Sequence, residues 1–191
     1  MGRLVERKGI DHALRAFPMV LARHPDARYL VVGDGPYRST LEQIAKSLSI
    51  SEQVVFAGEV GPEELVSHYA LAEIFIQPNR DLADGDTEGF GLVFLEANAC
   101  GKPAIAGRAG GAPDAVTHGE NGLLVDGYDI DAIAITIDSL LTDDHLRAKL
   151  REGALARAAV SSWQDRVGEF RELCTALISR TWQGSKPHEL S

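Results

Sequence analysis

The sequence predicts an α/β fold: a doubly wound, mainly parallel sheet followed by a C-terminal run of helices. Short apolar segments that suit strands alternate with segments of helical periodicity over residues 10–125. The strand segments are apolar without alternation, as expected of strands that are buried on both faces of a parallel sheet. From residue 129 onward the pattern is helical only, which places the sheet before a closing set of helices.

The first half of the chain begins with a helix and then alternates. Apolar residues recur at helical spacing between Ile10 and Leu21, and Pro25 ends the helix. Pro18 should kink or split this helix, because proline removes a hydrogen bond and clashes with the preceding turn. The next predicted elements are a strand within 27–36, a helix at 37–48, a strand at 53–56, a helix at 62–71 and a strand at 73–77.

The second half begins with a polar loop at 79–87, whose glycine and aspartate residues favour turns. A helix is expected to start near Gly91 and to end at the Gly101-Lys102-Pro103 sequence. The remaining predictions are a strand at 104–106, a helical turn at 110–116, a strand at 121–125, helices at 129–142, 143–159 and 163–181, and a disordered tail at 183–191.

Composition and charge narrow the class of ligand. The chain has 191 residues, 45% of them hydrophobic, and a net charge of −9. This acidity argues against a general nucleic-acid or anionic-membrane surface. The first 24 residues are locally basic, which suits a discrete anionic ligand. The basic residues there are Arg3, Arg7, Lys8, Arg15 and Arg23, against Glu6 and Asp11.

Cysteine content and hydropathy indicate the cellular compartment in which the protein is expected. Cys100 and Cys174 have no metal-like spacing and indicate reduced, buried thiols. No signal peptide opens the sequence and no apolar run reaches transmembrane length, so we expect a cytoplasmic protein. The six histidines form no metal-binding motif, and no zinc site is predicted.

Glycines follow several predicted strands and mark a ligand-binding edge. They lie at Gly33-Asp34-Gly35, at Gly58, in the 79–91 loop and between Gly107 and Gly111. Ligands of open parallel sheets bind beyond the carboxyl ends of the strands, so these turns should line one edge. The stretch 86–101 adds Glu88 and Glu96, on either side of the expected start of a helix. A helix N-terminus can bind an anion, although a carboxylate near one can also be a simple dipole partner.

Three further motifs have a structural explanation beside a functional one. The turn at Gly33 and Gly35 lacks the third glycine of a dinucleotide fingerprint, because position 38 is Arg. The Asp84-Gly85-Asp86 sequence has the spacing of a metal-chelating carboxylate pair, but it lies in a loop that already requires turn residues. The Gly-Gly-Ala-Pro sequence at 110–113 suits a helix start as well as a close approach to a ligand.

Six segments in order resemble a known family. They are R-L-x-x-x-K-G at 3–9, the GDGP turn at 33–36, Gly58, E-G-F-G-x-x-x-x-E at 88–96, A-C-G-K-P at 99–103 and G-G-x-P-D-x-V at 110–116. Together they resemble the C-terminal, nucleotide-sugar-binding domain of retaining GT-B glycosyltransferases of the family 4, or group 1, type. The resemblance covers about residues 2–180 and implies one half of a GT-B fold, with a Rossmann-like sheet and a donor-binding domain at 1–182.

The resemblance implies a role for each matching position. Arg3 and Lys8 would neutralise the diphosphate as it leaves, and Glu88 would hold hydroxyls of the transferred sugar. Glu96 would hold the ribose hydroxyls. The remaining donor contacts are expected, largely through the backbone, at Gly33, Gly58, Val60, Phe90, Gly91, Leu92 and Val93. In this family the reaction retains the anomeric configuration of the sugar, and it usually needs no metal or other cofactor. We assign no protein side chain as general base.

A GT-B enzyme closes a cleft between two such domains, and this sequence matches only one. The N-terminal acceptor domain, the expected partner besides a UDP-, GDP- or ADP-linked sugar, is not matched, and any membrane contact would be made through it. The strand that precedes the R-L segment in the family is also absent, which should cost stability or expose a pairing edge. We therefore expect this chain to transfer a hexose only together with the N-terminal acceptor domain. The alternatives are a non-hydrolysing sugar-nucleotide epimerase, a phosphorylase-like GT-B enzyme and a non-catalytic nucleotide-binding module.

Overall fold

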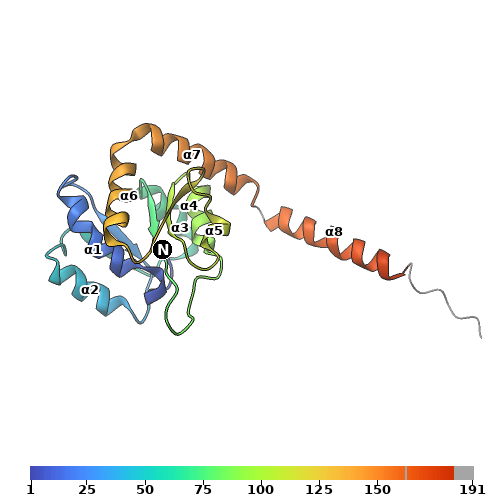
Figure 1. Cartoon of the computed structure of the whole chain (residues 1–191), viewed down its shortest axis with the longest axis horizontal. Helices are drawn as coiled ribbons and strands as arrows, with labels where there is room; N and C mark the ends of the chain where they lie inside the picture. The colour runs from blue at the N-terminus through green and yellow to red at the C-terminus, as the bar shows by residue number, and fades with distance from the viewer. Residues whose placement is uncertain (162, 183–191) are drawn as a thin grey trace, which may run out of the picture. The chain divides into compact units, whose positions relative to one another are not determined.

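The computed structural model describes residues 1–161 and 163–182 (Figure 1). The chain forms two compact units, Met1–Ala158 and a second unit that begins at Ala159. The tail predicted at 183–191 lies outside the described residues.

The first unit alternates strands with helices, as the sequence predicts. Its elements are a short 3-10 helix η1 (Glu6–Lys8), α1 (Ile10–Leu21), β1 (Tyr29–Val32), α2 (Arg38–Ser47), β2 (Val54–Gly58), α3 (Pro62–Leu71), β3 (Phe75–Gln77), α4 (Leu92–Ala99), β4 (Ala104–Gly107), α5 (Ala112–Ala115), β5 (Gly122–Val125), α6 (Ile130–Thr142) and α7 (Asp144–Ala159). The second unit holds α8 (Trp163–Trp182).

The strands are all parallel, but they form two sheets. One sheet has the order β1-β2 and the other has the order β3-β4-β5. The pairs β1–β2, β3–β4 and β4–β5 are parallel throughout. The α/β fold class is therefore confirmed, while the expected single sheet is divided between β1 and β3, which are not paired with each other.

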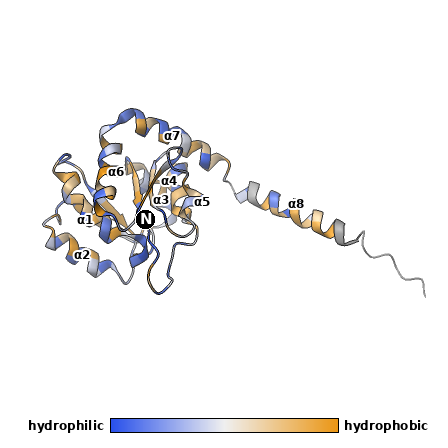
Figure 2. Ribbon diagram, viewed as in Figure 1, coloured by the Kyte–Doolittle hydropathy of each residue, from blue (hydrophilic) through white to orange (hydrophobic). Residues whose placement is uncertain are grey.

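Helices cover both faces of the strands, and β4 shows why. Ile105 belongs to a core cluster with residues of α1, α2 and α6, such as Leu14, Leu41 and Ile133. Its neighbours in β4 face the opposite way, into a second cluster built around Phe94 of α4. Successive side chains of a strand point to opposite faces, so an apolar strand without alternation needs cover on both. The hydropathy colouring of Figure 2 shows these apolar strands enclosed by the helices.

Local signals act largely as the sequence predicts. Helix α1 runs without interruption through Pro18, so the expected split does not occur. Asp129 caps α6 by accepting a hydrogen bond from the backbone N–H of Ala132 at 2.9 Å. Cys100 and Cys174 are free thiols, as expected, but each is half-exposed rather than buried.

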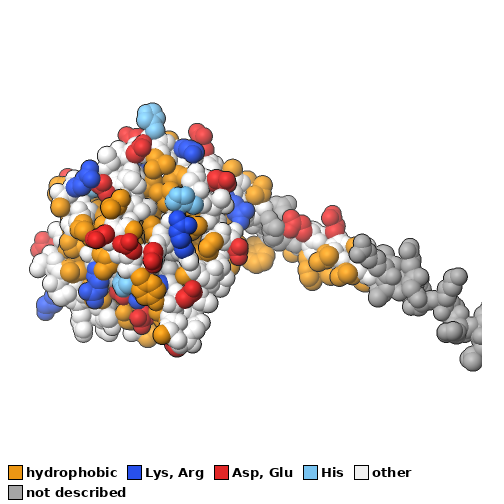
Figure 3. All heavy atoms as spheres, in the orientation of Figure 1, with side chains coloured by type: hydrophobic (Ala, Val, Ile, Leu, Met, Phe, Trp, Pro, Cys, Tyr) orange, Lys and Arg blue, Asp and Glu red, His pale blue; other side chains and the backbone are white. Residues whose placement is uncertain are grey.

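Acidic and basic side chains are interspersed on the visible face of the first unit (Figure 3). In the second unit, α8 exposes a series of large apolar side chains: Trp163, Val167, Phe170, Leu173, Leu177 and Ile178. Within residues 1–161 and 163–182, no helix is both long enough and apolar enough to span a membrane.

Candidate nucleotide-sugar site

The chain start is fixed against the carboxyl end of β1. The backbone N–H of Gly2 donates to the Val32 carbonyl at 2.9 Å, and that of Leu4 donates to the Asp34 carbonyl at 2.8 Å. A Cβ at Gly33 would lie 1.9 Å from the carbonyl oxygen of Gly2, and the φ of Gly33 is +125°. Only glycine allows this approach, which holds the segment that carries the exposed Arg3 at the predicted edge.

A buried ion pair joins the start of the chain to the loop before α4. The ammonium of Lys8 donates to Glu88 at 2.9 Å, and the two residues are only 9% and 8% exposed. The amide of Gln77, the last residue of β3, donates to the same carboxylate oxygen at 3.0 Å. Two donors thus fix the direction of the Glu88 carboxylate. Lys8 and Glu88, both predicted as catalytic, are brought together.

Two neighbouring contacts support that pair. The guanidinium of Arg7 donates a hydrogen bond to the Asp86 carboxylate at 2.9 Å, so the residues that precede Lys8 and Glu88 in the two segments are also in contact. Gly9 lies so close to the backbone of Pro78 that a Cβ there would be 2.0 Å from its carbonyl oxygen. The segment at 7–9 and the segment at 78–88 are therefore joined residue by residue, although about 80 positions separate them.

Helix α4 begins at the glycine that the sequence predicts. Gly91 is its N-cap residue, with a φ of +78°, and a Cβ there would lie 2.5 Å from the ring of Phe94. The backbone N–H of Gly111 donates to the Glu88 carbonyl at 2.9 Å, so the second glycine turn supports the first. Phe90 and Leu92 flank the helix start and are exposed. The first turn of α4 therefore presents backbone N–H groups beside the carboxylate of Glu88.

Glu96 lies within α4 and is half-exposed. Its carboxylate accepts a hydrogen bond from the Tyr69 hydroxyl at 2.7 Å. Burial, followed by this hydrogen bond and the negative charge of Glu96, raises the pKa of Tyr69, so the tyrosine remains a donor. One oxygen of the Glu96 carboxylate is thereby fixed.

The glycine turns of β1 and β2 also meet at this edge. The backbone N–H of Gly33 donates to the Gly58 carbonyl at 2.7 Å. Val60 follows two residues later and is half-buried, and Val93 is half-buried in the first turn of α4. Gly33 and Gly58 therefore lie together, as predicted, whereas a contact between Val60 and a base remains a prediction.

Sequence reasoning missed two residues of this site, Gln77 and Tyr69. Gln77 carried a usable signal, because it is the polar last residue of an apolar strand whose carboxyl end points to the ligand edge. Tyr69 carried none, since it lies in α3 and reaches Glu96 only through the fold.

The carboxylates of the Asp84-Gly85-Asp86 sequence have protein partners. Asp84 accepts from the backbone N–H of Asp86 at 3.0 Å, and Asp86 pairs with Arg7. Among residues 1–161 and 163–182, no three histidine, cysteine or acidic side chains gather as a metal site would require.

Comparisons of the sequence with known proteins agree with one another. The family model of the glycosyl transferases of group 1 matches residues 1–157. A GDP-mannose-dependent alpha-(1-6)-phosphatidylinositol monomannoside mannosyltransferase of Mycolicibacterium smegmatis is 45% identical over 169 residues, 87% of this chain and 44% of the relative. A D-inositol 3-phosphate glycosyltransferase of Acidothermus cellulolyticus is 42% identical over 176 residues, 87% of this chain and 38% of the relative. The chain spans less than half the length of these curated relatives.

Solved structures show the same relationship. The C-terminal domain of a glycosyl transferase group 1 family protein, LpcC, from Francisella tularensis has a TM-score of 0.71 and 28% identity, covering 84% of this chain and 83% of that one. HepE from Anabaena, in complex with UDP and glucose, has a TM-score of 0.76 and 27% identity, covering 93% of this chain and 47% of that one. The resemblance drawn from the ordered motifs is thus confirmed, and the chain belongs to the glycosyl transferases of group 1.

Proposed function

We propose that this chain is the donor-binding half of a retaining glycosyltransferase, which moves a hexose from a nucleoside-diphosphate sugar to an acceptor. The observation that carries the proposal is the Lys8–Glu88 pair beside the start of α4. It brings together a lysine ammonium, a carboxylate and the backbone N–H groups at the N-terminus of a helix. A diphosphate joined to a sugar needs these groups: positive partners for its oxygens and an acceptor for its hydroxyls.

The proposal gives each end of the 88–96 stretch a separate task. Glu88, fixed by Lys8 and Gln77, would accept hydrogen bonds from hydroxyls of the transferred sugar. Glu96, fixed on one side by Tyr69, would accept from the ribose hydroxyls. The N-terminus of α4 lies between the two carboxylates along the chain, where the diphosphate that joins sugar to ribose would be bound.

Lys8 and Arg3 would supply the charge that the reaction needs. As the bond between the sugar and the diphosphate breaks, negative charge gathers on the leaving oxygen, and cations fixed nearby stabilise that transition state. Lys8 is already oriented by Glu88 and has two further N–H donors for phosphate. Because Asp86 is engaged by Arg7, we propose that binding needs no metal, so that EDTA leaves the donor affinity unchanged.

GDP-mannose is the first donor to test, because the mannosyltransferases that share 44–45% identity with this chain are named for it. UDP-glucose is the second, because HepE has been crystallised with it. Calorimetric titration with GDP-mannose, UDP-glucose and ADP-glucose would rank them. Failure of all three to bind at millimolar concentration would refute the proposal.

Two substitutions test the division of labour. Glu96→Ala should weaken the binding of GDP and of GDP-mannose equally, by about tenfold, because each loses a charge-assisted hydrogen bond. Glu88→Gln, which keeps a side-chain oxygen for the Lys8 ammonium, should weaken the binding of GDP-mannose several-fold because its hydrogen bonds to the sugar are no longer charge-assisted, but should weaken the binding of GDP by much less. Glu152→Ala, on the exposed surface of α7, serves as the matched control and should change neither affinity. Equal losses for GDP without a sugar in both site variants would contradict the assignment.

The acceptor site is proposed to lie on a second domain, because the chain spans less than half the length of the curated relatives. The purified chain alone should therefore bind a donor without transferring its sugar. Sugar transfer by the purified chain to any lipid or inositol acceptor would refute this part of the proposal.

A further inference from the structure

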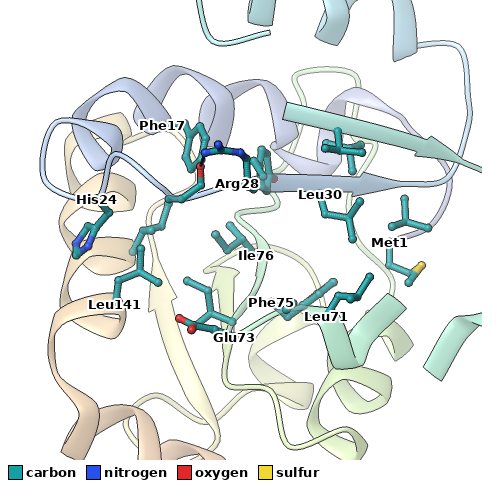
Figure 4. A pocket seen from close by; sticks show the side chains of 18 of the residues that line it. Met1, Phe17, His24, Arg28, Leu30, Leu71, Glu73, Phe75, Ile76 and Leu141 are labelled. Carbon is teal, nitrogen blue, oxygen red and sulfur yellow. Dashed lines mark hydrogen bonds between the residues drawn. The ribbon is translucent and has the colours of Figure 1, made fainter. Parts of the chain in front are cut away.

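Strand β3 leads into the loop that ends at Glu88, and it pairs with a strand on one side only. Its residues Phe75, Ile76 and Gln77 pair with Ala104–Ala106 of β4. On its other side, a cavity of about 870 Å³ lies between β3 and β1, and all three residues of β3 line it (Figure 4). Within the sheet, the carboxyl end of β3 is therefore held by β4 alone.

The main-chain ladder between β3 and β4 stops at Gln77, and the side chain of Asn79 continues it. Pro78 has no N–H to donate, and the N–H of Asn79 turns back to the carbonyl of Gln77 at 2.8 Å. The side-chain amide of Asn79 instead accepts from the backbone N–H of Gly107 at 3.1 Å and donates to the carbonyl of Ala109 at 2.8 Å. Asn79 is fully buried, so loss of its amide would leave buried main-chain groups short of partners.

The segment 107–111, which the amide of Asn79 holds, also holds Glu88. The backbone N–H of Gly111 donates to the Glu88 carbonyl at 2.9 Å. A Cβ at Gly110 would lie 2.1 Å from the same carbonyl oxygen, so only glycine permits this approach. The loop between Asn79 and Glu88 therefore has both of its ends on one segment. A change in the position of that segment at one end would be passed to the other.

We propose that Asn79 is a positioning residue for Glu88 and, through it, for the selection of the donor sugar. The amide of Asn79 fixes the segment 107–111, and this segment fixes the main chain of Glu88. Lys8 and Gln77 then direct the carboxylate from that fixed point. The inference rests on the proposed function, which assigns the Glu88 carboxylate to hydroxyls of the transferred sugar. Asn79 itself contacts no atom of the donor in this scheme.

The effect expected of Asn79 differs from that of a residue that only stabilises the fold. A general loss of stability changes the affinities for the sugar nucleotide and for the bare nucleoside diphosphate by the same factor. A displaced Glu88 carboxylate changes only the affinity for the sugar nucleotide, because the bare diphosphate has no sugar hydroxyl to bind it. Displacement weakens a hydrogen bond without removing it, so the ratio of the two affinities should fall about fivefold, less than for a charge-assisted hydrogen bond lost completely.

The test compares Asn79→Leu with Asn121→Leu in the full chain. Leucine is close to asparagine in shape but has neither donor nor acceptor, so each variant removes one buried amide without adding charge. Asn121 is 1% exposed, and its amide bonds to Ala115 and Thr117 at the other end of α5, so it matches Asn79 in burial without holding the segment 107–111. The ligands are whichever of GDP-mannose, UDP-glucose and ADP-glucose binds the unmodified chain most tightly, and the corresponding nucleoside diphosphate.

Two measurements are made on each variant. In Asn79→Leu, the ratio of the affinity for the sugar nucleotide to that for the diphosphate should fall about fivefold, whereas in Asn121→Leu it should stay the same. Amide hydrogen exchange tests the structural step without any ligand. Exchange at Gly107 and Gly111 should accelerate at least about tenfold relative to Ile105, in the middle of β4, in Asn79→Leu but not in Asn121→Leu.

Faster exchange at Gly107 without faster exchange at Gly111 would overturn the proposal, because the effect of Asn79 would not reach Glu88. Equal changes of the affinity ratio in the two variants would overturn it as well. Failure of the unmodified chain to bind any donor would refute the proposed function, while exchange at Gly111 separately tests the hold of Asn79 on the segment. If Asn79→Leu does not fold, Asn79→Asp replaces it: this variant keeps the acceptor for Gly107 and lacks the donor for Ala109. Its charge acts on the diphosphate of both ligands, so the affinity ratio still reports on the sugar.

Discussion

The ion pair between Arg80 and Asp11 offers the sharpest test of how the site is supported. Arg80 donates to both oxygens of the Asp11 carboxylate, at 2.8 and 3.0 Å, and the two side chains are 3% and 7% exposed. Its backbone N–H also donates to the carbonyl of Arg7 at 2.9 Å. The pair therefore connects the loop that leads to Glu88 with the segment that carries Lys8.

Arg80→Met removes the charge and keeps most of the apolar stem. Breaking a buried ion pair by removing one partner costs about 3–5 kcal/mol, because a carboxylate is left buried without its partner. We expect about 4 kcal/mol for this pair, since it is bidentate and nearly inaccessible. With a urea slope of about 2 kcal/mol per molar, this loss lowers the unfolding midpoint by about 2 M. Arg80→Met with Asp11→Leu should recover much of it, because no unpaired charge remains.

The matched control is Arg38→Met. Arg38 also contacts two carboxylates, those of Asp34 and Glu42, but all three side chains are substantially exposed. Solvent screens exposed pairs, so the midpoint should fall far less than in Arg80→Met. Urea unfolding followed by far-UV circular dichroism measures all variants. Equal losses in Arg80→Met and Arg38→Met would refute the argument, as would a double variant no more stable than Arg80→Met alone.

Two further predictions concern the start of the chain. Gly9→Ala should lower the free energy of unfolding by at least about 2 kcal/mol, because the φ of Gly9 is +69° and the new Cβ would meet the Pro78 carbonyl. The control is Gly85→Ala, where φ is +86° but the space around the new Cβ is open. It should lower the free energy of unfolding by about 1 kcal/mol in the same urea titration. The Met1 α-amino pKa falls from 8.0 to about 5 on folding, so the unfolded chain binds more protons between these values and stability should rise with pH across that window. N-terminal acetylation, on a sample whose mass confirms Met1, should abolish that rise; a rise of the same size after acetylation would assign it to other groups.

Local patterns were enough to predict the elements and the ligand edge. The unalternating strands, the proline at the start of α3 and the glycine at the start of α4 act within a few residues of themselves. Parallel strands then bring their carboxyl ends to one edge whatever the details of packing. This is why Gly33 and Gly58 could be placed near one another from the sequence.

Contacts between distant segments could not be predicted in the same way. Basic residues near the start were recognisable as anion partners, but nothing local shows that Lys8 rather than Arg7 would reach Glu88. The hydrogen bond from Tyr69 to Glu96 depends on how α3 lies against α4. The division into two sheets could not be predicted either, because no local pattern shows that β1 and β3 are not paired with each other.

The proposed donor site is therefore a product of the tertiary structure. Lys8 belongs to a single 3-10 turn, too short to be stable alone, and its position relies on the backbone of Pro78 and on Glu88. A nucleotide sugar that uses Lys8 and Glu88 together can bind only after these segments have joined. Binding and folding are then linked, so a bound donor must stabilise the contacts at 7–9 and 78–88 by RT ln(1 + [L]/Kd). Because Arg80 and Gly9 support the same junction, variants at these two residues should weaken donor binding without touching the donor.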